Sequence, residues 1–447
     1  MSESELIHRS YAKLSIGFTD HSLCARCGTC AGVCPVSAID FDEQFYPRLN
    51  HERCIECGLC ARTCPGAHVG FSDLNQAVFN RKEPAPGFDG YVRQTWVGQA
   101  TDDGIRSGGA SGGVVTALLW DLLKNGVVDG CVATRMNRKE PWRSEPFIAR
   151  SYSDLLDSQG SRYTIIPINQ MLAEIRNTVG RYAIAALPCQ VHGIRMAIQS
   201  IPDLAMKIAL IIGLFCGGSL EPYAITELLE ARKINKNKLA RFEFRGGDWP
   251  GRIRAIMQDG ETKNLHYSNY KDGAYIYLIS LYMPQRCQTC VDGSNEFSDL
   301  SVGDAWTRDN QGNYKSRSCS KILVRTAQGE KALLEARERG SIQAQSVTLD
   351  PSYRTHKIQT QRKGIAAPLR IERWRRKGLP VPDYDRPLPQ TTLKESFSER
   401  IVTGCLYLGR FYWIRFPAIK LLTSYGAMPL IALRVWIKNR KYRNSNQ

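Results

Sequence analysis

The chain has 447 residues, of which 43% are hydrophobic and 23% are charged, which is typical of a globular protein with two or three domains. No stretch approaches the roughly 18 uninterrupted apolar residues of a membrane-spanning helix, so the sequence predicts no such helix. The formal net charge is +17, but 20 of the 60 Lys and Arg and only 5 of the 43 Asp and Glu follow residue 351, which leaves the body nearly neutral.

The first predicted element, residues 24–65, contains one cysteine motif twice. The spacing Cys-x-x-Cys-x-x-Cys-x-x-x-Cys-Pro begins at Cys24 and again at Cys54. It matches the bacterial two-cluster ferredoxins, in which three cysteines of a motif bind one cluster and the fourth binds the other. The insert at residues 38–47 is expected to form a short strand and a turn. The spacing therefore predicts one [4Fe–4S] cluster on Cys24, Cys27, Cys30 and Cys64 and a second on Cys54, Cys57, Cys60 and Cys34.

Structural zinc and disulfide bonds are the alternatives for these cysteines. Zinc sites usually pair two CxxC units from separated turns, and a disulfide framework requires an oxidising compartment. The chain begins with polar and acidic residues, and no apolar run before Cys24 could serve as a secretory signal. We therefore expect reduced, metal-binding cysteines in a cytoplasmic protein.

Residues 1–85 are thus predicted to be a ferredoxin-like domain with two [4Fe–4S] clusters. Residues 81–87 are interpreted as a linker, because two prolines and a glycine among charged residues neither extend a helix nor join a central strand. Over residues 86–350, strand-like apolar runs alternate with helical patterns, which predicts an α/β body with a mixed sheet. The runs cover residues 127–134, 182–187, 208–215, 242–245 and 322–325, and the helical patterns cover residues 114–124, 191–200, 222–232 and 330–339.

A glycine-rich loop precedes the first of these helical patterns. Residues 107–113 include Gly108, Gly109, Gly112 and Gly113 and run directly into the helix expected at 114–124. Glycines let backbone N–H groups approach a phosphate closely, and a helix N-terminus favours an anion. By itself the pattern fits a phosphate-binding loop and a flexible turn equally well.

Four more cysteines follow predicted strands or lie in a loop of the body. Cys189 and Cys216 come after apolar runs, and Cys287 and Cys290 form a CxxC pair before Asp292. Strand ends are where an α/β sheet places its ligand sites, so these thiols are candidates for a third cluster. On spacing alone, buried cysteines that only pack, a redox dithiol and half of a zinc site remain open.

Residues 351–447 form a basic, proline-interrupted C-terminal extension. A basic run at 370–377 is followed by four prolines between residues 380 and 389, and this segment is expected to be extended and poorly packed. Beyond residue 397, aromatic residues such as Trp413 and Trp436 lie among Lys and Arg in a predicted helical tail. This composition fits an anionic membrane surface, a partner subunit or the chain's own body.

Several short motifs of the body occur in a distinctive order. They are the loop 107–113, SQGSRY at 158–163, LPCQ at 187–190 with GIR at 193–195, IGLFC at 212–216, FRGG at 244–247, the Cys287–Cys290 pair with Asp292, and SDLSVGD at 298–304. Together they resemble the coenzyme F-420 hydrogenase/dehydrogenase beta-subunit family over roughly residues 90–350. The resemblance implies a flavoprotein that binds FAD in the α/β body, beside a [4Fe–4S] cluster held by Cys189, Cys216, Cys287 and Cys290.

The resemblance also implies flavin contacts. It suggests a position near the FAD pyrophosphate for Gly108, Gly109, Gly112 and Gly113, with second candidates in Gly160, Ser161, Arg162 and Tyr163. Arg245 is expected against the flavin or its substrate, and a surface ion pair is the alternative for these arginines. His192 and Arg195 are candidates for placing a proton or a charge near the flavin, although His192 is equally well a satisfied histidine at a helix start. The catalytic residues are unknown from sequence.

The sequence therefore predicts an iron–sulfur flavoprotein oxidoreductase that passes electrons between [4Fe–4S] clusters and FAD to reduce or oxidise an organic acceptor. The expected partners are a ferredoxin or another redox protein and a small acceptor such as coenzyme F-420. The alternative is a non-catalytic electron-transfer subunit of a larger membrane-associated complex. Nucleic-acid binding has only the charge of the tail in its favour and is not expected. The expected location is the cytoplasm, at the inner face of the membrane if the tail binds lipid.

Overall fold

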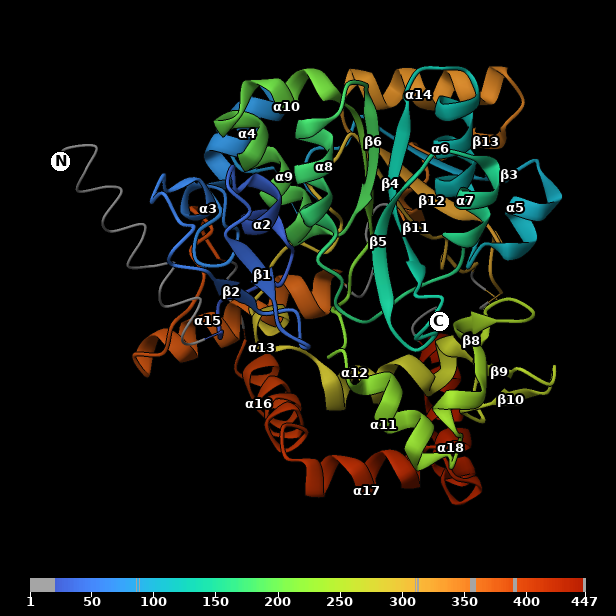
Figure 1. The fold of residues 1–447 in the computed structure, drawn as a ribbon. Coiled ribbons are helices and arrows are strands. Elements are labelled where there is room, and N and C mark those ends of the chain that lie inside the picture. Colours follow the sequence, from blue (N-terminus) through green and yellow to red (C-terminus); the bar gives the residue numbers. More distant parts are fainter. Residues whose placement is uncertain are drawn as a thin grey trace.

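An eight-stranded mixed β-sheet occupies the centre of the molecule (Figure 1). The computed structural model describes residues 21–85, 87, 89–309, 311, 313–353, 359–388 and 392–444. In spatial order the strands are β13 (Ile342–Ser346), β3 (Gln94–Ala100), β12 (Ser320–Val324), β11 (Leu300–Asp304), β7 (Ile208–Leu214), β6 (Tyr182–Ala186), β4 (Gly130–Met136) and β5 (Ser144–Ala149). The four strands from β11 to β4 are parallel to one another, and the outer strands pair antiparallel. The predicted mixed α/β class is confirmed.

The apolar runs of the sequence become the central strands because both of their faces are covered. All five residues of β6 are buried, and so are residues 210–213 of β7, as expected for parallel strands between two helical layers. One face of the sheet packs against α6 (Val114–Lys124), α7 (Tyr152–Asp157) and α14 (Ala327–Glu338). The other face packs against α8 (Leu172–Asn177), α9 (Pro188–Ser200) and α10 (Pro202–Lys207).

The cysteine-rich N-terminal module lies on this second helical layer and shares its core. Val33, Phe71 and Leu74 are at most 2% exposed and belong to the same apolar cluster as Ile184 and Val191 of the body. The β1–β2 hairpin confirms the strand and turn expected at residues 38–47. The module consists of α2 (Thr29–Val33), β1 (Ile39–Phe41), β2 (Pro47–Leu49), α3 (Leu59–Arg62) and α4 (Phe71–Phe79).

A smaller antiparallel sheet stands beside the central one. It contains β8 (Leu239–Gly246), β9 (Arg252–Met257) and β10 (Thr262–Asn264), and it packs with α11 (Ala224–Ala231) and α12 (Tyr275–Tyr282) in a separate core. The strand expected at residues 242–245 therefore exists, but it belongs to this small sheet. Alternate residues Phe242 and Phe244 are buried, which is the pattern of an antiparallel strand with one covered face.

The C-terminal extension follows the surface of the body as η5 (Gln359–Ala366), α15 (Ala367–Arg376), α16 (Leu393–Leu408), α17 (Tyr412–Leu422) and α18 (Met428–Asn444) (Figure 1). The expected poor packing after residue 377 is wrong. Tyr384 is 3% exposed, and Asp383 exchanges two main-chain hydrogen bonds with Ala67 and Val69 of the N-terminal module. An extended segment packs well here because the module supplies partners for its backbone.

The inner side of the tail is attached to the body through an ion pair. Arg415 of α17 donates from Nε to Glu227 of α11 at 2.8 Å, and both residues are buried. Ile419, also on α17, is fully buried in the core of the small sheet. Contact with the chain's own body, one of the three roles expected for the tail, is therefore confirmed for this side.

Candidate redox site

The two cysteine motifs of the N-terminal module form two cavities, and each cavity takes three cysteines from one motif and one from the other. Both halves have the same backbone, because Gly28 (φ 86°) and Gly58 (φ 71°) start the short helices α2 and α3 in the left-handed region. Each helix leads its fourth cysteine toward the other cavity. The inner set is Cys24, Cys27, Cys30 and Cys64, and the outer set is Cys34, Cys54, Cys57 and Cys60. The structure thus brings together both predicted groups.

The inner set has the chemistry of a cluster site. Burial, with a smaller contribution from Cys64, raises the pKa of Cys24 to about 12, and burial raises that of Cys27 to about 11. These thiols ionise together only beside compensating positive charge, which iron supplies. Each thiolate of a [4Fe–4S] cluster bonds its own iron, so the thiols stand farther apart than those around one zinc ion. Among the described residues, no three His, Cys, Asp or Glu side chains converge on a single-ion site.

The four scattered cysteines of the body also converge, and we call them the body set. Cys189 lies in the first turn of α9 and Cys216 follows β7, so two neighbouring parallel strands deliver them to the same edge of the sheet. Cys287 lies in α13 (Gln285–Gln288), and Cys290 lies just beyond it. Burial raises the pKa of Cys189, and four nearby thiols raise it further: Cys27, Cys290, Cys287 and Cys216.

The three sets lie in series from the surface to the interior. Cys57 of the outer set is exposed. Cys60 of the outer set is close enough to Cys30 of the inner set to raise its pKa, after the effects of burial and of the inner thiols. Cys27 of the inner set acts in the same way on Cys189. At the far end, Cys216 lines a cavity of the body.

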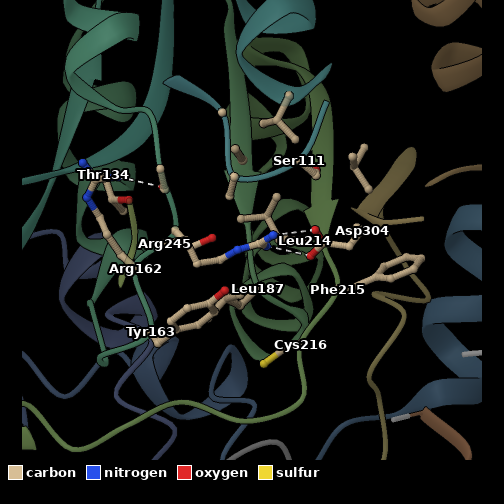
Figure 2. Close-up of a pocket in the computed structure, with 18 of the residues that line it drawn as sticks. Ser111, Thr134, Arg162, Tyr163, Leu187, Leu214, Phe215, Cys216, Arg245 and Asp304 are labelled. Atoms are coloured by element: carbon tan, nitrogen blue, oxygen red, sulfur yellow. Dashed lines mark hydrogen bonds and ion pairs between the residues drawn. The ribbon is translucent and has the colours of Figure 1, made fainter. Parts of the chain in front are cut away.

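This cavity has a volume of about 290 Å³ and lies at the carboxyl ends of the parallel strands, where α/β sheets bind ligands (Figure 2). Thr134, Ala186, Leu214 and Asp304 line it from β4, β6, β7 and β11. Seven of the nine predicted flavin contacts also line it, namely Gly109, Gly113, Gly160, Ser161, Arg162, Tyr163 and Arg245.

Gly108 and Gly112 do not line the cavity. Close packing, rather than a ligand, explains why these two positions are glycine. A Cβ atom on Gly108 would lie 2.1 Å from Oε1 of Gln159, and one on Gly112 would lie 2.6 Å from the carbonyl oxygen of Gly98. Of the four glycines in the loop, only Gly109 and Gly113 line the cavity, beside Ala110 and Ser111. Gly113 has φ 70° and immediately precedes α6.

Arg162, which is partly buried, places a positive charge in the cavity wall. Its Nη1 donates to the carbonyl oxygens of Ser158, Gln159 and Gly160 at 2.9, 2.9 and 3.0 Å, and its Nη2 donates to that of Asp157 at 3.0 Å. Its Nε is buried and has no hydrogen-bond partner. Burial lowers the pKa of Arg162 to about 10. A partly buried cation whose buried Nε has no hydrogen-bond partner fits a negatively charged ligand group.

Arg245 lines the same cavity, but its guanidinium is already engaged (Figure 2). Both carboxylate oxygens of Asp304 accept from it at 2.8 and 2.9 Å, and the carbonyl oxygen of Pro250 accepts from its Nε at 3.0 Å. The guanidinium carbon lies 4.5 Å from the ring centre of Tyr270. The expected alternative of an ion pair is therefore present, although the pair is buried rather than at the surface, and Arg245 holds the wall in shape.

An aromatic wall in the same cavity was predicted only in part, because the sequence pointed to Tyr163 but not to Tyr270 or Tyr275. The ring of Tyr163 stacks on that of Tyr270 with centroids 5.4 Å apart and lies 4.6 Å from that of Tyr275. Tyr275 begins α12, and Tyr270 lies in the irregular segment before it. Among the unpredicted lining residues, Asp304 had a sequence signal as the last residue of the motif at 298–304, whereas Tyr270 and Tyr275 had none.

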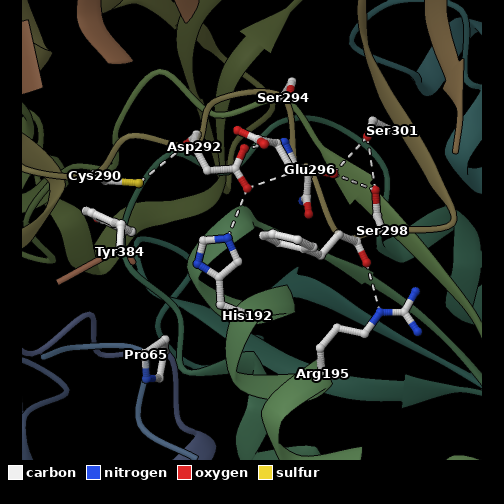
Figure 3. A network of polar contacts seen from close by, with 12 residues as sticks. Pro65, His192, Arg195, Cys290, Asp292, Ser294, Glu296, Ser298, Ser301 and Tyr384 are labelled. Atoms are coloured by element: carbon white, nitrogen blue, oxygen red, sulfur yellow. Dashed lines mark hydrogen bonds and ion pairs between the residues drawn. The ribbon is translucent and has the colours of Figure 1, made fainter. Parts of the chain in front are cut away.

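His192 and Arg195 lie outside the cavity, in a network behind the body set (Figure 3). Nε2 of His192 is 3.0 Å from Oδ2 of Asp292, and both side chains are buried. The Cys290 thiol donates to the carbonyl oxygen of Asp292 at 3.4 Å. Arg195 donates to the carbonyl oxygen of Phe297 and to Asp299. His192 is thus a satisfied helix-start histidine that steadies the loop carrying Cys290.

Comparison with protein families gives three matches. The family model described as 4Fe-4S dicluster domain matches residues 23–67. Two models of the coenzyme F420 hydrogenase/dehydrogenase beta subunit match residues 95–173, for the N-terminal part, and residues 179–350, for the C terminus. The segment beyond residue 350 lies outside these matches.

Individual relatives carry names from coenzyme F420 metabolism. One subunit of the F(420)H(2) dehydrogenase of Methanosarcina mazei is 28% identical over 317 residues, which are 70% of this chain and 81% of that protein. Coenzyme F420 hydrogenase subunit beta of Methanothermobacter thermautotrophicus is 26% identical over 294 residues, which are 64% of this chain and 95% of that protein. Coenzyme F420-dependent sulfite reductase of Methanocaldococcus jannaschii is 28% identical, and the match spans only 45% of its length.

Among solved structures, a chain of the F420-reducing [NiFe] hydrogenase complex from Methanosarcina barkeri is similar. The TM-score is 0.53 at 20% sequence identity, and the match covers 68% of this chain and 99% of that one. At this identity the likeness shows the fold of the body.

Proposed function

Because the chain belongs to the coenzyme F420 hydrogenase/dehydrogenase beta-subunit family and carries a 4Fe-4S dicluster domain, we propose that it is an iron–sulfur flavoprotein oxidoreductase that passes electrons between three [4Fe–4S] clusters and FAD. The observation that carries this proposal is the series of three thiol sets that ends at the cavity containing Arg162. Membership of the family supports iron–sulfur electron transfer. The third cluster and the flavin are parts of the proposal that go beyond the family match.

The residues of the cavity match the parts of FAD. The Nε of Arg162 and the backbone of Gly109 and Gly113, ahead of α6, suit the pyrophosphate. Tyr163, Tyr270 and Tyr275 form an apolar wall that excludes water from a planar ring. When bound, the flavin would exchange single electrons with the clusters and a hydride with an organic molecule. The Arg245–Asp304 pair fixes the wall between the small sheet and β11.

Coenzyme F420 is the organic acceptor or donor proposed first, because relatives of this chain are named for it. The proposed protein partner is a ferredoxin or another redox carrier that docks near the exposed Cys57 of the outer set. A second candidate function is that of an electron-transfer subunit whose flavin only relays electrons. The names of two relatives as subunits and the similar chain from a hydrogenase complex favour assembly with other subunits.

Iron and flavin analysis of anaerobically purified protein tests the proposal. We expect about twelve irons and one FAD per chain, since three four-iron clusters are assigned. A content of about eight irons would contradict the assignment of a cluster to the body set. Absence of flavin would contradict the assignment of the cavity as the flavin site. Adding coenzyme F420 to the reduced protein separates the two functions: reoxidation of the flavin indicates an enzyme, and an unreactive flavin indicates a relay.

A further inference from the structure

The C-terminal extension reaches the loops that carry the body set, although it lies beyond the residues matched by the family. Three hydrogen bonds join it to residues beside the cysteines. Arg362 donates to the carbonyl oxygen of Gly217, next to Cys216, at 3.3 Å. Arg370 and Tyr384 donate to the carbonyl oxygens of Gln288 and Thr289, between Cys287 and Cys290, at 3.2 and 3.0 Å. The extension therefore forms part of this site.

Lys363, in η5 of the extension, brings a positive charge to the same place. Its side chain is almost completely buried, with 3% of the residue exposed. The groups that act on it electrostatically are, in order, the thiols of Cys290, Cys216 and Cys287 and the phenol of Tyr384. A buried ammonium group is costly unless a negative charge faces it, and a cluster with four thiolate ligands supplies that charge.

We propose that Lys363 raises the reduction potential of the cluster held by the body set, so that the extension adjusts the last cluster before the flavin. The proposal rests on the third cluster of the proposed function. One electron entering the cluster adds one negative charge, and a fixed positive charge beside it stabilises the reduced form more than the oxidised form. Burial keeps solvent from screening this interaction.

The test compares Lys363→Met with Lys363→Arg and with the control Lys207→Met, which removes an ammonium group held by carbonyl oxygens of α8 and the loop after it. The midpoint potential of each cluster is measured by anaerobic redox titration with electron paramagnetic resonance, together with iron content. In Lys363→Met, we expect the midpoint potential of the body cluster to fall. The equilibrium between its reduced and oxidised forms should shift at least tenfold toward the oxidised form, which corresponds to 59 mV for a one-electron couple.

Lys363→Arg and Lys207→Met should keep the wild-type potential, and the outer and inner clusters should not shift in any variant. If Lys363→Met instead loses only the iron of the body set while Lys363→Arg retains it, that result would also support the conclusion that the positive charge of Lys363 stabilises this cluster. Full iron content with an unchanged potential in Lys363→Met would overturn the proposal and leave the proposed function intact. About eight irons in the wild type would overturn both.

An independent observation concerns the outer faces of α16, α17 and α18. Of 19 exposed large hydrophobic side chains among the described residues, 14 lie between Phe397 and Ile437. Trp413 is 72% exposed and Tyr425 is 71% exposed. From Arg400 to the end of the chain the sequence has nine Lys and Arg and no Asp or Glu; Arg415 points inward to Glu227, whereas Arg400, Arg410 and Lys420 are exposed. This tail face, as we call it, is therefore apolar, aromatic and basic.

We further infer that the tail face binds the surface of an anionic membrane. Tryptophan and tyrosine prefer the level of the lipid headgroups, and basic side chains are attracted to anionic lipids. A second copy of this chain fits poorly, because the exposed Arg400, Arg410 and Lys420 of one copy would repel those of the other. No single described helix is long and apolar enough to span a bilayer; α17 and the start of α18 pass that test only together and are bent by 78°. The inner side of α17 is held by Glu227 and the core of the small sheet, which favours contact at the membrane surface.

Flotation of the full chain with lipid vesicles tests this inference. We expect it to float with vesicles of phosphatidylcholine and phosphatidylglycerol, less at high salt, and not with phosphatidylcholine alone. Replacing Tyr412, Trp413 and Leu421 by serine should lower the floated fraction at least fivefold. The matched control replaces Val179 and Met206, which are 99% and 71% exposed elsewhere, and should change nothing.

Iron and flavin contents are compared to establish that each variant is folded. If the triple variant is not folded, the double variant Arg410→Ser and Lys420→Ser provides a second test. Absence of flotation, or equal flotation with neutral vesicles, would overturn the inference. Self-association that disappears in the triple variant would also overturn it, because the face would then cover a second copy of the chain.

Discussion

Anaerobically purified Cys189→Ser protein is expected to contain about eight irons instead of about twelve and to lose reduction of its flavin through the clusters. Cys189 stands between Cys27 of the inner set and the other thiols of the body set. A serine there removes a ligand of the proposed third cluster, through which electrons would pass from the N-terminal module to the cavity. The measurements are iron content and the rate of flavin bleaching after mixing with a reduced ferredoxin.

Two comparisons make this result specific. Cys319→Ser changes a partly exposed cysteine outside all three sets and should retain about twelve irons and the wild-type rate. Direct reduction of the flavin by a chemical reductant should survive in Cys189→Ser, because the cavity itself is unaltered. Full iron content in Cys189→Ser would contradict the assignment of this residue as a ligand.

The second large effect is expected for Arg162→Met, which should weaken FAD binding by about 10- to 100-fold. A hydrogen bond to a charged group contributes roughly 1.5–3 kcal/mol, and the unused Nε of Arg162 is the donor available for a phosphate. Fluorescence titration of the flavin-depleted protein with FAD measures the dissociation constant. Arg162→Lys should be intermediate, since an ammonium group keeps the charge without the planar array of donors.

Folding of the loop is the competing explanation for a loss of flavin. Arg162 also binds four carbonyl oxygens at the end of α7, so thermal unfolding of each variant is recorded beside binding. Arg150→Met, which removes a half-exposed arginine paired with Glu174, is the matched control and should bind FAD normally. An unchanged dissociation constant in a folded Arg162→Met protein would contradict the flavin assignment of this cavity.

The glycine-rich loop illustrates how far a local pattern leads. Its four predicted contacts share one composition, yet only Gly109 and Gly113 face the cavity, because Gly108 packs against Gln159 and Gly112 against β3. Glycine is required both where a ligand approaches and where two pieces of backbone touch, and the sequence does not distinguish these causes. Likewise, Tyr270 and Tyr275 of the cavity wall had no signal, since a buried tyrosine in a helix usually belongs to a core.

The amino-acid sequence by itself determined the grouping of the inner and outer cysteine sets, because their spacing is local and the two halves repeat the same backbone turn. It also determined the mixed α/β class, because short apolar runs that alternate with helical patterns favour central strands covered on both faces. Only the tertiary structure decided that Cys216, Cys287, Lys363 and Tyr384 meet. These residues come from a strand end, a loop and the C-terminal extension, and their contacts depend on how the layers pack rather than on any local pattern.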